Sequence, residues 1–292
     1  MLSSRAAETA RDLSLANCDF AGKSATIHSW EVLRSAQDDM LFRVALSLVS
    51  RPDSTTALQC FTLALMSRGV FITFEGSEGC GKSTQVKRLA SRLEQAGVPV
   101  LITREPGGTT IGEKIRDLLQ FAPESFAMAP ETELLLFEAS RSQLVRETIR
   151  PALEQGSVVI SDRFFDSTTV YQGVAREIEP GIVEKLNDFA VGAERPDLTF
   201  ILDVNVATAR ARMLRRVRPV QAVDRMEQEP VEFYERVGEG YRELARREPA
   251  RIRLLDGSRS PDEIEGEIWR EVSGRFPAML ALRKKGDAAR AS

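Results

Sequence analysis

One segment constrains this chain more than any other: residues 76–83 read GSEGCGKS, which fits the pattern G-x-x-x-x-G-K-[ST]. A β-branched and aromatic run at 70–75 precedes it, and apolar residues at helical spacing follow it from Lys82 to about Gln95. Glycines let successive backbone N–H groups turn inward towards phosphate oxygens, and the helix that follows adds the positive end of its dipole. The strand–loop–helix context therefore predicts a loop that binds the phosphates of a nucleotide.

Within this loop, the residue types match the chemistry that phosphates require. Lys82 is expected to reach the β- and γ-phosphates of the nucleotide, and the Ser83 hydroxyl to bind Mg²⁺. Cys80 fills a free position where a small side chain suffices, and a redox role for its thiol stays open. We assign nucleotide contacts to the whole loop: Gly76, Ser77, Glu78, Gly79, Cys80, Gly81, Lys82, Ser83 and Thr84.

Beyond the loop, strand-like and helix-like segments alternate, which is typical of a parallel sheet covered by helices on both faces. The predicted fold is an α/β P-loop NTPase fold with a five-stranded parallel sheet. Because such sheets carry their chemistry at the carboxyl ends of the strands, Glu75, Arg104, Asp162 and Asp203 should lie near the loop. The predicted strands span 70–75, 97–103, 157–162, 198–203 and 251–256, and the predicted helices 82–95, 111–120, 131–155 and a segment from Pro261.

The 292-residue chain changes character near residue 66. Residues 1–65 have no sustained helical or strand period, and they carry acidic residues that a mitochondrial-type presequence lacks. We interpret them as a poorly ordered N-terminal extension; the alternative is that Met66 is the true start. Residues 66–282 are predicted to form the nucleotide-binding domain, and the charged and small residues 283–292 are expected to fray.

Composition argues against several classes of function. Lys and Arg number 40 against 43 Asp and Glu, so the net charge of -3 offers no basic excess to hold a nucleic acid. No stretch of the sequence approaches the ~20 apolar residues of a membrane span. The three cysteines and the single histidine lack the spacing of a disulfide framework or a zinc site, which makes a reducing cytoplasm the expected location.

A phosphate-binding loop does not by itself name a function, since switches, motors and small-molecule kinases all carry it. The helix predicted at 131–155 puts Phe137 and Arg141 of the string FEASR on one face, where a ring and a guanidinium can hold a planar base. Two strand ends continue as REPGGT at 104–109 and DRF at 162–164, and YQG occupies 171–173. The chain has no N-K-x-D string, which a GTPase switch would use to recognise its base.

Positive charge gathers at 210–218, where five arginines occur in nine residues and no acid follows until Asp224. A solvated helix face usually mixes charge signs, so this run calls for another explanation. Phosphoryl transfer between two anions needs positive charge at the moving group and exclusion of water, which a mobile arginine-rich lid supplies. We therefore predict a small mobile lid at about 210–227, with Arg212, Arg215 and Arg216 as candidates to contact the transferred group and Arg225 to order the lid.

With these motifs the chain resembles the thymidylate kinase family, in its bacterial type with an arginine-rich lid, from about Val70 to about Val272. The resemblance implies five parallel strands, ATP in the phosphate loop and an acceptor nucleoside monophosphate facing it. It also suggests a homodimer. The predicted reaction is ATP + dTMP → ADP + dTDP with Mg²⁺. The alternatives are a kinase for another nucleoside monophosphate or a non-catalytic, nucleotide-gated module.

By position, the resemblance implies roles for single residues. Phe137 would stack on thymine and Arg141 would bond its carbonyl edge; core packing of Phe137 and exposed helix positions for Arg116 and Arg141 are the alternatives. Glu78 is expected at the sugar 3′-hydroxyl or at Mg²⁺, and Asp162 at the Mg²⁺ water shell or only at the strand end. The substrate site would be completed by Arg104, Glu105, Arg116, Arg163, Thr168, Tyr171 and Gln172, in which the arginines hold the acceptor phosphate.

Overall fold

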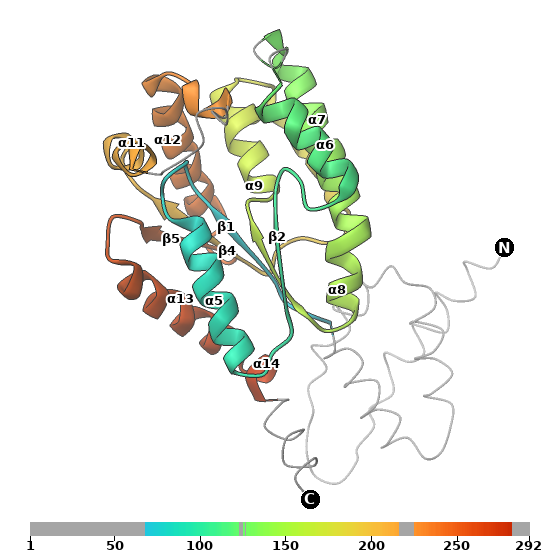
Figure 1. The fold of residues 1–292 in the computed structure, drawn as a ribbon, viewed down its shortest axis with the longest axis vertical. Helices are drawn as coiled ribbons and strands as arrows, with labels where there is room; N and C mark the ends of the chain where they lie inside the picture. Colours follow the sequence, from blue (N-terminus) through green and yellow to red (C-terminus); the bar gives the residue numbers. More distant parts are fainter. Residues whose placement is uncertain (1–67, 123–124, 126, 216–224, 282–292) are drawn as a thin grey trace, which may run out of the picture. The chain divides into compact units, whose positions relative to one another are not determined.

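The computed structural model describes residues 68–122, 125, 127–215 and 225–281, and its centre is a five-stranded sheet (Figure 1). The strand order is β2-β3-β1-β4-β5, and each neighbouring pair is parallel. The α/β fold with five parallel strands predicted from the sequence is therefore confirmed. The strands are β1 (Phe71–Glu75), β2 (Val100–Arg104), β3 (Val158–Asp162), β4 (Leu198–Asp203) and β5 (Ile252–Asp256).

Side chains of the central strand alternate between two separate cores, because successive residues of a strand point to opposite faces. On one face, Ile72 and Phe74 pack with the helices α5 (Lys82–Gln95) and α13 (Pro261–Arg275). On the other face, Phe71 packs with apolar residues of the long helical segment that begins with α7 (Pro130–Leu144). Every residue of β1 is buried, so the strand that leads into the phosphate loop is held rigidly from both sides.

Two groups of helices cover the second face of the sheet. The first is a continuous helical segment made of α7 (Pro130–Leu144), the π-turn η2 (Val145–Ile149) and α8 (Arg150–Glu154). The second consists of η3 (Thr169–Ala175) and α12 (Val231–Arg247), whose apolar side chains pack on β4 and β5. The remaining elements are α6 (Thr110–Gln120), α9 (Phe165–Thr168), α10 (Pro180–Val191), α11 (Val206–Leu214), η4 (Arg225–Gln228) and α14 (Pro277–Ala281).

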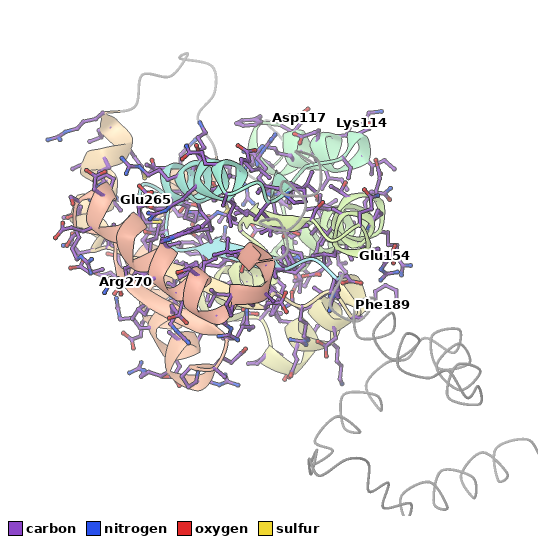
Figure 2. All side chains as sticks on the ribbon, turned by 90° about the horizontal axis from the view of Figure 1, so that it is seen from below. Lys114, Asp117, Glu154, Phe189, Glu265 and Arg270 are labelled. Atoms are coloured by element: carbon purple, nitrogen blue, oxygen red, sulfur yellow. The ribbon has the colours of Figure 1, made fainter. Side chains whose placement is uncertain are left out.

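The helix predicted at 131–155 is present but is interrupted by a π-turn. Pro151 follows that turn and has no N–H with which to continue a regular α-helical ladder. Charged residues of the covering helices face outward, as Lys114 and Asp117 of α6 and Arg270 of α13 illustrate (Figure 2). Within the part of the chain that the structure describes, no helix combines the length and apolar character needed to cross a membrane.

Several expectations fall on residues outside the described ranges. They concern the N-terminal extension at 1–65, the tail at 283–292 and the centre of the lid at 216–224, which includes Arg216. The two flanks of the lid are described: α11 leads into it and η4 follows it.

Candidate active site

The phosphate loop joins the carboxyl end of β1 to the first turn of α5. Gly76 and Gly79 have φ angles of 129° and 78°, which side chains other than glycine rarely adopt. A Cβ atom at Gly76 would lie 2.5 Å from the carbonyl oxygen of Leu202, and one at Gly79 would lie 2.5 Å from that of Ala209. Backbone strain and space therefore both require these two glycines, and the loop lies tightly between β4 and α11.

Lys82 begins α5 and turns its side chain back over the loop. Its Nζ donates to the carbonyl oxygens of Gly76 at 3.0 Å and Ser77 at 2.9 Å, and lies 3.6 Å from Sγ of Cys80. The ammonium group is thus held inside the loop, where the backbone N–H groups and the helix dipole favour anions. This arrangement suits the predicted contact of Lys82 with nucleotide phosphates.

The next residue, Ser83, meets the end of β3. Its hydroxyl donates to Oδ2 of Asp162 at 2.6 Å. Hydroxyl and carboxylate oxygens are hard donors of the kind Mg²⁺ selects, and this ion usually takes its other ligands from water and phosphate. The pair therefore fits Mg²⁺ chemistry. Among the described residues, no group of three or more His, Cys, Asp and Glu side chains could hold a metal ion by itself.

Arg163, which follows Asp162, has a φ angle of 75°, an uncommon value for a residue with a side chain. Its N–H donates to Phe74 O at 2.9 Å, and its carbonyl accepts from the Ser161 hydroxyl at 2.6 Å. These bonds fix the turn that directs the guanidinium towards the phosphate loop. There Nη2 donates to Oε1 of Glu78 at 2.5 Å, and it lies 3.3 Å from the Tyr171 hydroxyl.

Glu78, Arg163 and Tyr171 were predicted to share one site, and the structure brings them together. The Tyr171 hydroxyl donates to Oε2 of Glu78 at 2.8 Å. Burial raises the pKa of Glu78, but Arg163 and Lys82 outweigh it, so the pKa of this carboxyl lies below its ordinary value. Glu78 is therefore ionised at neutral pH, and it links the phosphate loop to the arginine expected to bind the acceptor phosphate.

Arg141 differs most from its expected surroundings. It is only 1% exposed, so the alternative of an exposed helix arginine is wrong. Its five N–H groups donate to Glu105 twice, at 2.9 and 2.7 Å, and once each to Glu138, Thr168 and Asn187. An arginine has five donors, and all are used here. A bond from Arg141 to a base carbonyl requires one of these bonds to break, and that role stays a prediction.

The carboxyl of Glu105 shares this buried network. Burial raises its pKa to about 7, although the charge of Arg141 opposes the shift and Glu138 adds to it. Phe137 is half-buried one helical turn before Arg141 on α7, as its spacing predicted. Thr168 is buried and accepts from Arg141, so its hydroxyl helps to order the network.

A second network joins Gln172, which was predicted to line the base pocket, to the flank of the lid. Gln172 is buried and donates to Oε1 of Glu133 at 2.7 Å. The same Glu133 carboxylate accepts from Arg225 of η4 and from Arg176 at 3.2 Å. Arg225 also donates to Leu119 O at 3.3 Å. Arg225 is thus anchored between α6 and α7, which supports its predicted role in ordering the lid.

The remaining predicted arginines lie around this centre. Arg104 donates to the Glu113 carboxylate at 2.8 and 3.0 Å, and Arg116 donates to Pro106 O at 2.9 Å, so both lie beside the REPGGT turn. Among the lid candidates, Arg212 contacts the phosphate loop, donating to Gly257 O at 2.8 Å and to Cys80 O at 3.4 Å. Arg215 is exposed at the end of α11.

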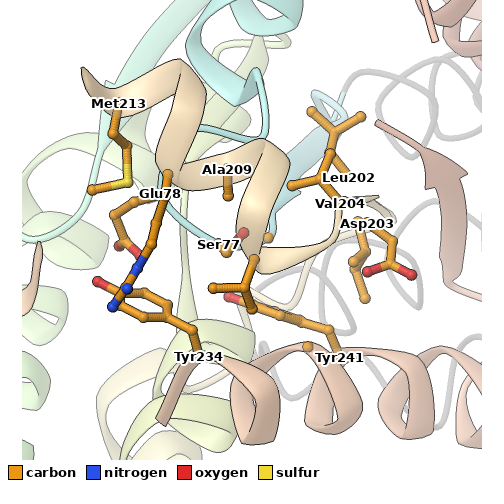
Figure 3. Close-up of a pocket in the computed structure, with 14 residues that line it drawn as sticks. Ser77, Glu78, Leu202, Asp203, Val204, Ala209, Met213, Tyr234 and Tyr241 are labelled. Atoms are coloured by element: carbon orange, nitrogen blue, oxygen red, sulfur yellow. The ribbon is translucent and has the colours of Figure 1, made fainter. Parts of the chain in front are cut away.

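A small pocket, partly open to solvent, lies on the lid side of the phosphate loop (Figure 3). It is bounded by Ser77 and Glu78 of the loop, by the end of β4, and by α11 and α12. Figure 3 places Tyr234 and Tyr241 of α12 opposite Met213 and Ala209 of α11. The helices that flank the lid therefore border the phosphate loop directly.

Three residues of the site were given no role from the sequence: Glu75, Ser167 and Tyr241. The Glu75 carboxylate is fully buried and accepts from both the Ser167 and the Tyr241 hydroxyls. Burial, with Asp166 nearby, raises the pKa of Glu75 to about 7 against the opposing charge of Arg163. A charged residue at the end of an apolar strand was a visible signal, whereas nothing in the sequence pointed to Tyr241.

Comparisons with known proteins agree with this geometry. A family model described as thymidylate kinase matches residues 74–268. The thymidylate kinase of Geobacter sulfurreducens is 50% identical over 192 residues, which cover 65% of this chain and 90% of that protein. That of Deinococcus radiodurans is 44% identical over 210 residues, which cover 72% and 99%. The crystal structure of thymidylate kinase from Ehrlichia chaffeensis aligns with a TM-score of 0.57 at 34% identity, covering 70% of this chain and 99% of that one. This chain belongs to the thymidylate kinase family.

Proposed function

We propose that this chain transfers the γ-phosphoryl group of ATP to dTMP and releases ADP and dTDP. The observation that carries the proposal is the contact of Arg163 with Glu78, which puts an arginine at the end of β3 against the phosphate loop. An anion bound by Arg163 would face phosphates bound in the loop. Membership of the thymidylate kinase family supports dTMP as that anion.

In this reaction an oxygen of the acceptor phosphate attacks the γ-phosphorus in line. The new P–O bond forms as the bond from the γ-phosphorus to the bridging oxygen breaks, and that oxygen leaves with ADP. The acceptor is already ionised at neutral pH, so the chain need not supply a general base. Its contribution is positioning and the stabilisation of negative charge.

The side chains divide this work between them. Lys82 binds the β- and γ-phosphates, Arg163 holds the acceptor phosphate, and Arg212, Arg215 and Arg216 are the candidates in the lid to contact the transferred group. When bound, Mg²⁺ would neutralise charge on the donor phosphates, held by Ser83 and by Asp162 directly or through water. Their 2.6 Å hydrogen bond supports this assignment because it brings two hard oxygen donors together beside the loop.

The base pocket of the proposed site lies between α7 and η3. Phe137 stacks on thymine, and Thr168, Tyr171 and Gln172 line the base and sugar. Arg104 and Arg116, on the REPGGT side, assist in holding the acceptor phosphate. Arg104 ends β2, Arg116 lies on α6, and the pocket residues lie on α7, α9 and η3. These helices contact one another, which supports the assignment.

The direct test is acceptor-dependent production of ADP from ATP and Mg²⁺, measured with dTMP, dUMP, dCMP, dGMP and AMP. We expect strong turnover with dTMP and slow turnover with dUMP, because a pocket discriminates one methyl group by only about 1–3 kcal/mol. Saturable ATP binding without acceptor-dependent ADP production would reject the kinase in favour of a nucleotide-gated module. Preference for another monophosphate would reject only the acceptor.

The same assay tests the domain boundary. Every residue assigned to the site or to the lid lies between Gly76 and Arg225, so a fragment of residues 66–292 should turn over dTMP as the full chain does. We further propose that the enzyme acts in the cytoplasm and as a homodimer. Exposed apolar side chains on the neighbouring helices α6 and α7 support the homodimer: Ile111, Leu118 and Leu135.

A further inference from the structure

Glu75 ends β1 one residue before the phosphate loop, and its carboxylate is fully buried. Three groups donate to it: the Phe164 N–H at 2.7 Å, the Ser167 hydroxyl at 2.6 Å and the Tyr241 hydroxyl at 2.9 Å. These donors come from the two sides of the proposed acceptor site, β3 and its following turn on one side and α12 on the other. The carboxylate therefore joins elements that are far apart in the sequence.

Each of the two hydroxyls also faces Arg163. Nη1 of Arg163 donates to Ser167 Oγ at 3.0 Å and lies 3.5 Å from the Tyr241 hydroxyl oxygen. A hydroxyl has one proton to donate and lone pairs with which to accept. Because Glu75 takes the proton of each hydroxyl, the lone pairs are left to face the guanidinium. Glu75 thus determines that both hydroxyls act as acceptors, and not as donors, towards Arg163.

Glu75 also fixes the backbone beside Arg163. The Phe164 N–H that it accepts belongs to the peptide directly after Arg163, whose φ angle of 75° is uncommon for a residue with a side chain. Such a conformation persists only where its surroundings enforce it. One carboxylate oxygen therefore holds the turn, and the other orients the two hydroxyls that contact the guanidinium.

We propose that Glu75 is a positioning residue for the acceptor phosphate: through Ser167, Tyr241 and the Phe164 N–H, it holds Arg163 in the orientation that binds this phosphate. The inference rests on the proposed role of Arg163. It requires a carboxylate rather than an isosteric amide. In the Glu75→Gln variant an NH₂ group would face the two hydroxyls, which would then have to accept, and a hydroxyl proton would turn towards the guanidinium.

The test separates binding of the phosphate from binding of the rest of the nucleotide. Thymidine shares the base and sugar of dTMP and lacks the phosphate, so the ratio of the thymidine Kd to the dTMP Kd reports the phosphate contribution. Calorimetric titration of the full chain, at a pH well above the pKa of about 7 that burial gives Glu75, would give both constants for the ionised carboxylate. We expect Glu75→Gln to lower this ratio by about 10-fold, since bonds to charged groups are among the strong ones, and to leave thymidine binding unchanged.

A matched control is Thr73→Val, on the same strand. Thr73 is also fully buried and shares a hydrogen bond of 2.7 Å with Thr199, outside the Arg163 cluster. We expect this variant to keep the wild-type ratio. If Glu75→Gln does not fold, as judged by its melting curve, Ser167→Ala keeps the carboxylate and removes one of the two hydroxyls between it and Arg163, and it should also lower the ratio.

A double-mutant cycle decides whether Glu75 acts through Arg163. In the Arg163→Ala background, Glu75→Gln should have no further effect on the ratio. A further loss of similar size would overturn the inference, and so would equal weakening of dTMP and thymidine by Glu75→Gln. If Arg163→Ala alone leaves the ratio unchanged, the assignment of Arg163 itself fails. A lower ratio for Arg163→Ala with no effect of Glu75→Gln rejects the role of Glu75 only.

Discussion

Lys82 donates to two carbonyl oxygens of its own loop. Exchanging these neutral acceptors for charged phosphate oxygens strengthens each bond, since charge-assisted hydrogen bonds are roughly twice as strong as neutral ones. The loop geometry already holds the ammonium group where the phosphates bind, so little reorganisation is needed at the moment of reaction.

We therefore predict that Lys82→Ala lowers kcat by about 10²–10³-fold, the usual effect of removing one preorganised donor. Initial rates at saturating ATP and dTMP would measure it. Lys87→Ala is the matched control, because Lys87 lies on the same helix but is exposed, and its rate should match that of the wild type. A Lys82→Ala enzyme within a few-fold of the wild-type rate would contradict the prediction.

Glu105 leads to a prediction about pH. Its pKa in the folded chain is about 7, above the ordinary value of 4.5, because burial disfavours the charged form. Between these two values the folded state keeps a proton that the unfolded state releases, so rising pH favours unfolding. The contribution is fully present below about pH 4.5 and is lost as pH rises to about 7, by at most about 1.4 kcal/mol per pH unit.

In Glu105→Gln this titration is absent. The stability of the wild type relative to this variant should therefore fall between pH 5 and pH 7 and level off above. Glu75, whose pKa is also about 7, titrates in both proteins and largely cancels in the difference. Urea unfolding in steps from pH 5 to pH 8 would measure the effect, and parallel stability curves would contradict it.

Residues within motifs could be placed from the sequence, and residues outside motifs could not. The resemblance of these motifs to the thymidylate kinase family implied that Glu78, Arg163 and Tyr171 share one site, and sequence spacing did not. Neither revealed that Arg141 is buried, because a carboxylate from α7 and another from the REPGGT turn surround it only in the folded chain. Tyr241 meets Glu75 across 166 positions of sequence, a distance over which no local pattern carries information.

Among the elements, α12 approaches η3 closely where Gly240 faces it. A Cβ atom at Gly240 would lie 3.1 Å from Cγ1 of Val170, a fully buried and β-branched side chain on η3. The π-turn η3 also carries Tyr171 and Gln172, which belong to the proposed nucleoside pocket. Gly240 therefore determines how closely α12 packs behind this pocket. In contrast, a Cβ atom at Gly266, within α13, would meet nothing within 4 Å.

The same substitution should thus have different effects at these two helix positions. Gly266→Ala should stabilise the fold by about 0.5–1 kcal/mol, because alanine restricts the unfolded chain and favours the helix. At Gly240 the crowding of Val170 offsets this gain, and displacement of η3 should also weaken dTMP binding. Chemical unfolding and dTMP titration of both variants would test this. Equal stabilisation by the two substitutions, with equal dTMP affinity, would contradict it.

Strands were predicted better than helices, because the sequence pattern of a buried strand is local and that of several of these helices is not. Buried parallel strands form short apolar, β-branched runs bounded by glycine or charge, and all five were placed within about three residues of their observed bounds. The elements α9, η3, α10 and α12 were not predicted. Two of them, α9 and η3, are short, and η3 is a π-turn that packs against α12, a contact that no local sequence pattern reveals.

For the whole molecule, the proposed homodimer depends on apolar surface left uncovered on one side of the sheet. Ile111 and Leu118 lie seven residues apart, on one face of α6, and both are exposed. Leu135, on the adjacent helix α7, is 55% exposed. Figure 1 shows α6 and α7 side by side, so these side chains can contribute to a single apolar area.

A charge placed within that area should separate the protomers, because an ionised carboxylate loses its hydration in an apolar interface and faces its own symmetry mate. We predict that Leu135→Glu sediments as a monomer at concentrations where the wild type sediments as a dimer. Its melting temperature measured as a monomer should change little, since an exposed position tolerates polar residues. The matched control is Leu214→Glu on α11, which places the same charge on an 88% exposed leucine and should leave the dimer intact. If both variants dissociate equally, or if neither dissociates, the interface does not lie on α6 and α7. If the wild type itself sediments as a monomer, the proposed homodimer is rejected.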